Sequence, residues 1–275
     1  MDGIRLYLRS MRMLLKSHLQ YPASFMMQTL AQLVMMSGEL LVVLLVIDRF
    51  DSLNQWTGGD IMVFFGVMTV SFYLTEFFGR GLTGNFSALI RSGKLDTFFL
   101  RPRGVLTQVL LSAMDPRRIS CIAVGIAALW MGCARIRVEW TLLKAAALLE
   151  AILFGSLLIL GLFMIEAIFA VHSVKSIEVV NVLTYGGRSA CEYPIDIYPT
   201  PLRVVFTAVA PFSLTMHAPV SYFLGKTLFG WPDWTAFVCP LAGAAFFGIM
   251  YLLFRRALRF YRSTGSSRAQ KTVPV

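Results

Sequence analysis

The chain contains apolar stretches long enough to cross a membrane, and these constrain its fold more than any other feature. Four of them cover residues 25–47, 61–78, 142–170 and 234–254, and a shorter one covers 119–133. A helix of about 20 mostly apolar residues spans the hydrocarbon core of a bilayer. Only 15% of the residues are charged, against about a quarter in soluble domains. The sequence therefore predicts an all-α polytopic membrane protein, in which Pro240 should kink the last crossing.

The sequence allows two arrangements for the fifth crossing. Hydropathy alone favours a helix over 202–224, although Pro211 and Pro219 would break it. The alternative is a short span over 176–191, followed by a broken re-entrant hairpin over 194–225. Non-helical backbone at membrane depth is tolerated only against protein or a water-filled cavity. Both arrangements predict six crossings, with both ends of the chain on the same side of the membrane.

The distribution of positive charge indicates which side that is. With the re-entrant arrangement, 18 of the 25 Lys and Arg residues lie on the side of the chain ends, in 1–23, 79–118, Lys175 and 255–275. The other seven are Arg49, Arg135, Arg137, Lys144, Arg188, Arg203 and Lys226. Cytoplasmic loops of membrane proteins carry an excess of Lys and Arg. We therefore expect both termini and the 79–118 loop to be cytoplasmic. The net charge of +10 then reflects membrane topology, and no nucleic-acid partner is expected.

The first 22 residues have the pattern of an amphipathic helix. Basic residues recur at steps of three or four and share one helical face: Arg5, Arg9, Arg12 and Lys16. Apolar residues follow nearly the same period on the adjoining face: Ile4, Leu8, Met11, Leu15 and Leu19. Such a helix can lie in the membrane interface, with its basic side toward anionic headgroups. The alternative is a cytoplasmic helix packed against the rest of the protein.

No group of residues in the sequence supports catalysis, a metal site or a bound cofactor. Gly225-Lys226-Thr227 looks like the end of a phosphate-binding loop, but Val220 stands where the first glycine is needed. The three histidines and four cysteines have no regular spacing. The cysteines are expected to be free thiols. We therefore expect a protein that is not itself an enzyme.

Acidic residues within the apolar stretches are the most unusual polar feature. Glu39, Glu76, Glu150 and Glu166 lie within predicted spans. An acid at the centre of a bilayer costs about 2.5 to 3.5 kcal/mol on insertion scales, so it normally faces protein or water. Glu39, near the middle of the first span, is open to two interpretations: contact with a cavity or cationic substrate, or a structural hydrogen bond between spans. For Glu76 and Glu166 the structural interpretation is favoured.

Three stretches together resemble one family. The stretch SGKLDTFFLRP (92–102) is similar to the SGxLDxxLLRP loop of a branch of bacterial ABC exporter permeases. The stretch YPIDIYPTPLRVVFTAVAPFSLTMHAP (193–219) is similar to that branch's YPxxIYPxxLRxxLTxxxP segment, and RFYRSTGSS (259–267) resembles its basic and aromatic ending. The order and spacing of the three stretches agree over nearly the whole chain. Two departures, Phe99 in place of Leu and Ala210 in place of Ile, keep an apolar residue.

The resemblance implies a permease subunit of a six-span type-2 ABC exporter in the bacterial plasma membrane. Such a subunit has an elbow helix (1–22), a cytoplasmic coupling helix within 79–118, a re-entrant outer hairpin (194–225) and a cytoplasmic tail (255–275). The family pattern thus favours the re-entrant arrangement. The implied partners are two ABC ATPase subunits, which would hold ATP and Mg, and a second, different permease.

In this interpretation residues 91–102 receive mechanical work from the ATPase. A short helix would enter a groove of the ATPase with Leu95, Phe98, Phe99 and Leu100, and Pro102 would end that helix. Charged residues would fix the register of the contact: Arg91, Lys94, Asp96 and Arg101. Closure of the ATPase pair would push residues 84–102 and tilt the spans, which gives alternating access. Apolar anchors inside a polar rim are what such an interface requires.

The translocation path or its gate is predicted to involve Glu39, Glu76, Tyr193, Pro194, Tyr198 and Pro199. The outer hairpin would be either an extracellular gate over a cavity shared by two permeases or a structural plug. An alternative function is an ion-coupled secondary transporter that uses Glu39 as its protonatable group. Such transporters usually show an internal repeat, and no repeat is evident between the halves of the chain.

Overall fold

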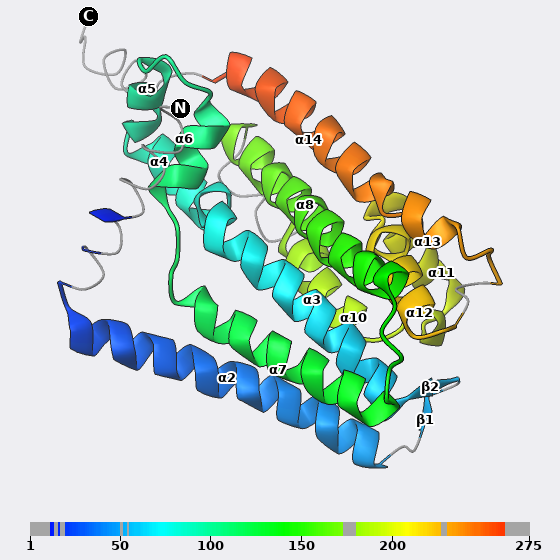
Figure 1. Ribbon diagram of the computed structural model, residues 1–275. Coiled ribbons are helices and arrows are strands. Elements are labelled where there is room, and N and C mark those ends of the chain that lie inside the picture. The colour runs from blue at the N-terminus through cyan, green and yellow to red at the C-terminus, as the bar shows by residue number, and fades with distance from the viewer. Residues whose placement is uncertain are drawn as a thin grey trace, which may run out of the picture.

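The structure is a computed structural model that describes residues 12–13, 16, 20–49, 52–53, 55–172, 180–226 and 230–261. These residues form a bundle of long helices with a group of short helices at each end (Figure 1). The predicted elbow helix over 1–22 and the tail after residue 261 lie almost entirely outside the described residues.

Five helices among the described residues are long and apolar enough to cross a membrane. They are α2 (Pro22–Arg49), α3 (Gly58–Gly79), α7 (Arg118–Ile136), α8 (Leu142–His172) and α14 (Leu241–Arg259), the last preceded by α13 (Thr235–Val238). Each coincides with an apolar stretch of the sequence, and the break between α13 and α14 falls at Pro240 as predicted. The prediction of a multi-pass helical membrane protein is confirmed.

The start of α3 is set by a local hydrogen-bond pattern. Two short antiparallel strands, β1 (Ser52–Leu53) and β2 (Trp56–Thr57), lead into the helix. The backbone N–H of Asp60 donates to the side chain of Thr57, whose own backbone N–H donates to the Asp60 carboxylate. This capping box satisfies two backbone donors that a helix start otherwise leaves free. The helix therefore begins at Gly58, before the apolar stretch does.

Helix α3 is the centre of the bundle and packs antiparallel to α7 at close range. A Cβ added at Gly66 would lie 2.8 Å from the backbone nitrogen of Leu129, and one at Gly132 would lie 2.9 Å from the carbonyl oxygen of Gly59. Small residues let the backbones of membrane helices approach closely, which favours their association. The glycines of α3 and α7 therefore specify which helices are neighbours.

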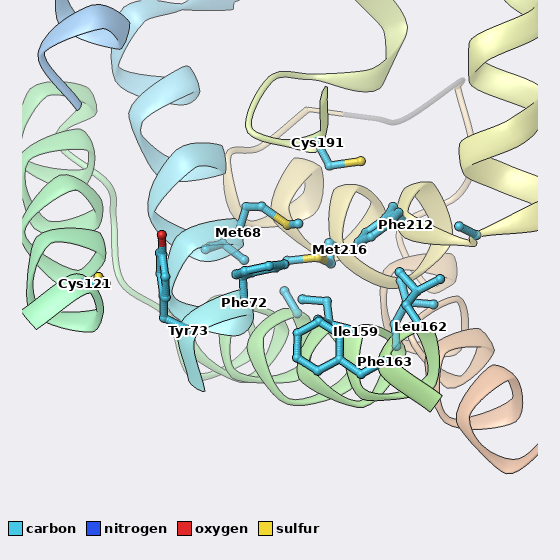
Figure 2. Close-up of a cluster of buried hydrophobic side chains, with 14 of the residues drawn as sticks. Met68, Phe72, Tyr73, Cys121, Ile159, Leu162, Phe163, Cys191, Phe212 and Met216 are labelled. Atoms are coloured by element: carbon cyan, nitrogen blue, oxygen red, sulfur yellow. The ribbon is translucent and has the colours of Figure 1, made fainter. Parts of the chain in front are cut away.

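The core lies where α3 and α8 meet residues 193–219, which we call the Pro-rich segment (Figure 2). Met68, Phe72 and Tyr73 come from α3, and Ile159, Leu162 and Phe163 come from α8. Phe212 and Met216 reach the same cluster from the Pro-rich segment. The rings of Phe72 and Phe163 meet edge to face, with centroids 5.9 Å apart. Aromatic pairs of this geometry stabilise a core beyond the area they bury.

Helices α2 and α14 lie at the periphery, and their outward faces are apolar. On α2 the exposed large side chains include Met26, Met27, Leu30, Val34, Met35, Leu41, Val42 and Leu45. On α14 they include Leu241, Ile249, Leu252 and Leu253. Exposed apolar patches of this extent mark contact with lipid or another protein. These two faces suit the hydrocarbon of a membrane.

The segment from residue 180 to 223 is short-helical and bent. It consists of η2 (Val182–Gly186), α10 (Gly187–Cys191), η3 (Ile195–Ile197), α11 (Thr200–Val204), η4 (Val205–Val209), η5 (Ser213–His217) and α12 (Ala218–Phe223). The helical arms before and after Ala210 and Pro211 meet at 85°. The described residues thus contain five apolar helices, or six if the bent pair is one span. The alternative fifth span over 176–191 is helical from residue 180 onward and otherwise lies outside the described residues.

Four short helices connect α3 to α7 at one end of the bundle (Figure 1). They are η1 (Arg80–Leu82), α4 (Gly84–Arg91), α5 (Lys94–Phe99) and α6 (Val105–Ser112). We call this part of the molecule the α4–α6 end. Ring contacts of Phe86 with Phe254 (5.7 Å) and of Phe99 with Tyr261 (5.7 Å) bring the last turns of α14 to the same end.

Candidate functional site

The short helix α5 presents the predicted coupling residues, and a glycine sets its direction. Gly93 has φ 68°, in the left-handed region that glycine enters without steric cost. This turn separates α5 from α4 and reverses the chain. As a result one face of α5 meets the bundle, while the other points away from it.

The four large apolar residues of this stretch are divided between these faces. Leu95 (0% exposed) and Phe98 (8%) are buried in the protein's own core, whereas Phe99 (45%) and Leu100 (86%) are exposed. Sequence reasoning assigned all four to a partner groove. In the structure the first two hold α5 against the bundle, and only the exposed pair is available to a partner.

The charged residues around α5 form a basic rim. Arg91, Lys94, Arg101 and Pro102 are exposed, and so is Arg103. Asp96 is half-buried on the inner side, next to Tyr261. Burial first, and then the Asp96 carboxylate, raise the pKa of Tyr261 to about 12. Tyr261 therefore keeps its proton. Its ring also stacks on Phe99 at an interplanar angle of 20°, and this contact joins the end of α14 to α5.

A buried glutamine of α6 fixes the loop that follows α5. The Gln108 side-chain amide donates to the carbonyl oxygens of Phe98 and Arg103, both at 2.9 Å. These two bonds close the chain between α5 and α6 into a compact turn. Sequence reasoning did not identify Gln108, although a lone amide within an apolar run (VLTQVLL) is a signal of a buried polar contact.

Hollows on both sides of α5 widen the partner-accessible surface. One of about 590 Å³ is lined from α4, α5 and α6, and includes Asn85, Ser92, Lys94 and Thr97. Another of about 310 Å³ lies at the turn after α5, and includes Arg101, Pro102, Arg103 and Leu111. The α4–α6 end is therefore a contoured surface that another protein can engage.

A charge cluster joins the short helices to the long ones. Glu76, near the end of α3, is buried and forms ion pairs with Arg80 (2.9 Å) and Arg118 (3.0 Å). The hydroxyl of Tyr185 also donates to Glu76, at 3.0 Å. Glu76 thus connects α3, the start of α7 and η2. This arrangement matches the structural interpretation of the acid, and the cluster lies where the α4–α6 segment leaves one span and enters the next.

Asp115 belongs to the same cluster and anchors the start of α7. Its carboxylate accepts from the guanidinium of Arg117 at 2.6 and 3.0 Å, and lies 3.4 Å from Arg118. Burial opposes ionisation of Asp115, but the hydrogen bond to Arg117 and the charges of three arginines prevail and lower its pKa. The DPRR run (115–118) at the start of a span is the sequence signal for this anchor.

A second charge cluster lies within the bundle. Arg188 of α10 is buried and forms ion pairs with Glu39 of α2 and with Glu192 (3.0 Å). Its guanidinium carbon also lies 5.0 Å from the ring centroid of Tyr73. The charge count placed Arg188 in an outer loop, whereas the structure places it between α2 and α3. Glu39 remains half-exposed (45%), so this cluster reaches the surface of the bundle between α2 and α10.

Four of the six predicted path or gate residues lie together at the opposite end of the bundle: Tyr193, Pro194, Tyr198 and Pro199. Glu39 and Glu76 belong to the two charge clusters and do not join them. The Tyr198 hydroxyl donates to the Ala190 carbonyl at 2.8 Å, and a ring nitrogen of His217 lies 3.1 Å from the carbonyl oxygen of Tyr193. Pro194 and Pro199 precede the starts of η3 and α11.

The segment that carries these residues is also fastened to α3. The indole N–H of Trp56 donates to the Asp196 carboxylate at 2.7 Å, and Lys226 forms an ion pair with Asp60. The first contact joins the segment over 194–225 to strand β2, and the second joins the residue after this segment to the first turn of α3. Sequence reasoning did not identify this pair of contacts, because its partners are far apart in the chain.

Together, the apolar helices define a multi-pass helical membrane protein. The sequence profile of ABC-2 family transporter proteins matches residues 33–265, which is most of the chain. The chain therefore belongs to the ABC-2 transporter family, whose permeases normally work with an ATPase partner. No curated protein and no solved structure matches the chain.

Proposed function

We propose that this chain is the permease subunit of an ABC exporter and is driven by a separate ATPase through α5 and the turn that follows it. The observation that carries this proposal is the division of α5 into two faces. Leu95 and Phe98 hold it to the bundle, while Phe99 and Leu100 stand exposed within a rim of positive charge. Apolar anchors in a polar rim are the usual form of a protein interface.

The α4–α6 end is proposed to face the cytoplasm of a bacterial cell, with both chain termini on that side. Arg255, Arg256 and Arg259 in the last turns of α14 support this orientation, because they lie at the same end as the basic rim of α5. Positive charge at helix ends is retained on the cytoplasmic side. ATP and Mg would be held by two ATPase subunits beneath this end.

The contacts suggest how movement of α5 would reach the spans. Gln108 joins the turn after α5 to α6, and Asp115 and Arg117 lead from there into α7. On the other side, Arg80 connects the short helices back to Glu76 of α3. Because α3 is the centre of the bundle, a push on α5 would tilt α3 against its neighbouring helices. Alternating access would follow from this tilt.

The translocation path is proposed to run beside α2 and α10, between this chain and a second, different permease. Glu39 is half-exposed there and paired with Arg188. The bent segment over 194–225 would close the outer end of this path as a re-entrant hairpin. Its opening would require release of the contacts that Asp196 and Lys226 make to the start of α3.

A photo-crosslinking experiment tests the coupling proposal. A crosslinking amino acid replaces Leu100 in the full chain expressed in its own host, and the crosslinked product is identified by mass spectrometry. We expect an ABC ATPase at this position. The matched control is Leu142, an equally exposed leucine at the first turn of α8, which should not crosslink to the ATPase. Equal crosslinking from both positions, or none from Leu100, would contradict the proposal.

The same preparation separates the exporter from the ion-coupled alternative. Vesicles that contain the permease and its partners should move substrate only with ATP. Transport driven by an ion gradient without nucleotide, and abolished by Glu39→Gln, would instead favour the secondary transporter. The ion pair with Arg188 argues against the alternative, because it engages Glu39 in a contact between helices.

A further inference from the structure

A cavity of about 460 Å³ lies between α6 and α14 at the α4–α6 end. Its walls come from the start of α6, from the second half of α14 and from Phe99 of α5. The lining residues are Phe99, Gly104, Val105, Leu106, Thr107, Phe247, Tyr251, Phe254, Arg255, Leu258 and Arg259. None of the coupling contacts described above fills this space.

The cavity has one basic end and one apolar end. Arg255 and Arg259 lie one helical turn apart at the end of α14, and Phe247 lies two turns before Arg255. At 1.5 Å per residue, the apolar wall extends about 12 Å along α14 from the level of Arg255. Tyr251 lies between the two ends, and the Arg255 guanidinium carbon is 5.8 Å from its ring centroid.

Within the part of the chain that the structure describes, the two arginines have no carboxylate to neutralise them. The cavity lining contains no Asp or Glu, and no acidic residue follows Asp233 in the sequence. Among the described residues, no ion pair involves Arg255 or Arg259. A ligand that complements this cavity would carry an anionic group for the arginines and a hydrocarbon chain for the apolar wall.

We propose that this cavity binds an anionic phospholipid of the leaflet that faces the α4–α6 end. The lipid phosphate would accept hydrogen bonds from Arg255 and Arg259, whose planar guanidinium groups suit phosphate oxygens. The upper part of an acyl chain would lie against Leu106 and Phe247. Leu252 and Leu253, on the same part of α14, are exposed, so the helix is already in contact with the hydrocarbon from which a lipid enters.

The proposed lipid would also affect α5, a consequence that rests on the proposed function. Phe99 forms part of the cavity wall and stacks on Tyr261 just beyond α14. A bound lipid would fill the space behind Phe99 and restrain α5 against the end of α14. Coupling to the ATPase would then respond to the anionic lipid content of the membrane.

The test uses the purified full-length permease without ATPase, and measures retained lipid by native mass spectrometry. The probe is phosphatidylglycerol, compared with phosphatidylcholine at the same concentration. We expect selective retention of phosphatidylglycerol, and about tenfold weaker binding in Arg255→Gln and in Arg259→Gln, because each removes a charge-assisted contact. Arg256→Gln is the matched control, since Arg256 is exposed on the same helix turn but does not line the cavity.

A second variant tests the apolar half of the site without changing charge. Leu106→Trp would occupy part of the cavity and should reduce phosphatidylglycerol retention. Equal loss in Arg256→Gln would show general attraction to a basic helix end and would overturn the proposal. Displacement of the lipid by millimolar inorganic phosphate would also overturn it, because the site would then hold only an anion. Crosslinking at Leu100 does not depend on lipid binding. Failure of the lipid proposal would therefore not contradict the coupling proposal.

Discussion

The side-chain amide of Gln108 donates to the carbonyl oxygen of Phe98 at 2.9 Å, and so joins α6 to the last turn of α5. Its second bond, to Arg103, holds the chain that runs between the two helices. This turn contains the exposed residues through which a partner would act. One buried polar side chain therefore sets the shape of the surface, although it is itself inaccessible to any partner.

Replacement of Gln108 by Leu should loosen this turn without unfolding the bundle. Leu fills a similar volume but leaves two carbonyl oxygens without their donor, and each lost hydrogen bond costs about 1 kcal/mol. Hydrogen–deuterium exchange should increase over residues 98–104 and stay unchanged in α3. The control is Thr107→Val at the neighbouring exposed position. Unchanged exchange in Gln108→Leu would contradict the assigned role.

Replacement of Glu76 by Gln should destabilise the whole permease. Arg80 and Arg118 would lose their ion pairs with a buried carboxylate, and breaking a buried ion pair by removal of one partner costs about 3 to 5 kcal/mol. The midpoint of thermal unfolding in detergent should fall clearly. Glu139→Gln is the control, because Glu139 is exposed just after α7. A midpoint that falls equally in both variants would rule out a specific role for the cluster.

The sequence predicted the long helices well because their signal is local. Hydropathy placed all five apolar helices, and breaks occur at Pro211 and Pro240 as predicted. The break predicted at Pro219 is wrong, because this proline lies in the first turn of α12 within the helical arm Ser213–Phe223, where a missing N–H is tolerated. The side-chain contacts at the ends were less predictable. That Leu95 and Phe98 face inward depends on how α5 folds back, which follows from the left-handed turn at Gly93. A sequence pattern over seven residues does not show which side of a short helix meets the bundle.

Arg188 illustrates a second limit of sequence reasoning. The charge count assigned it to the outer side of the membrane. Its partner Glu39 is 149 residues away in the chain. Only the folded arrangement brings these two groups together. A guanidinium within the bundle is costly when unpaired, and here two carboxylates and two aromatic rings offset that cost.

Substitutions in the Arg188 cluster should therefore depend strongly on one another. Arg188→Met leaves Glu39 and Glu192 facing each other without a cation, and should cost more unfolding free energy than Glu39→Gln alone. Adding Glu39→Gln and Glu192→Gln to Arg188→Met should recover much of that loss, because no uncompensated charge then remains buried. Unfolding midpoints of the single and triple variants measure this. Additive losses would show that the three residues do not act as a unit.

The lowered pKa of Asp115 predicts how acid affects the start of α7. A carboxyl group whose pKa is lower in the folded state stabilises the fold above its unfolded pKa, about 3.9 for Asp. That contribution is lost as the pH falls from there toward the lower folded pKa. Unfolding of the wild type should therefore become easier below about pH 4, and Asp115→Asn, less stable at pH 7, should lack this component. Asp233→Asn, at an exposed position, should keep the wild-type dependence. An unchanged acid response in Asp115→Asn would mean that Arg117 and Arg118 do not stabilise this carboxylate.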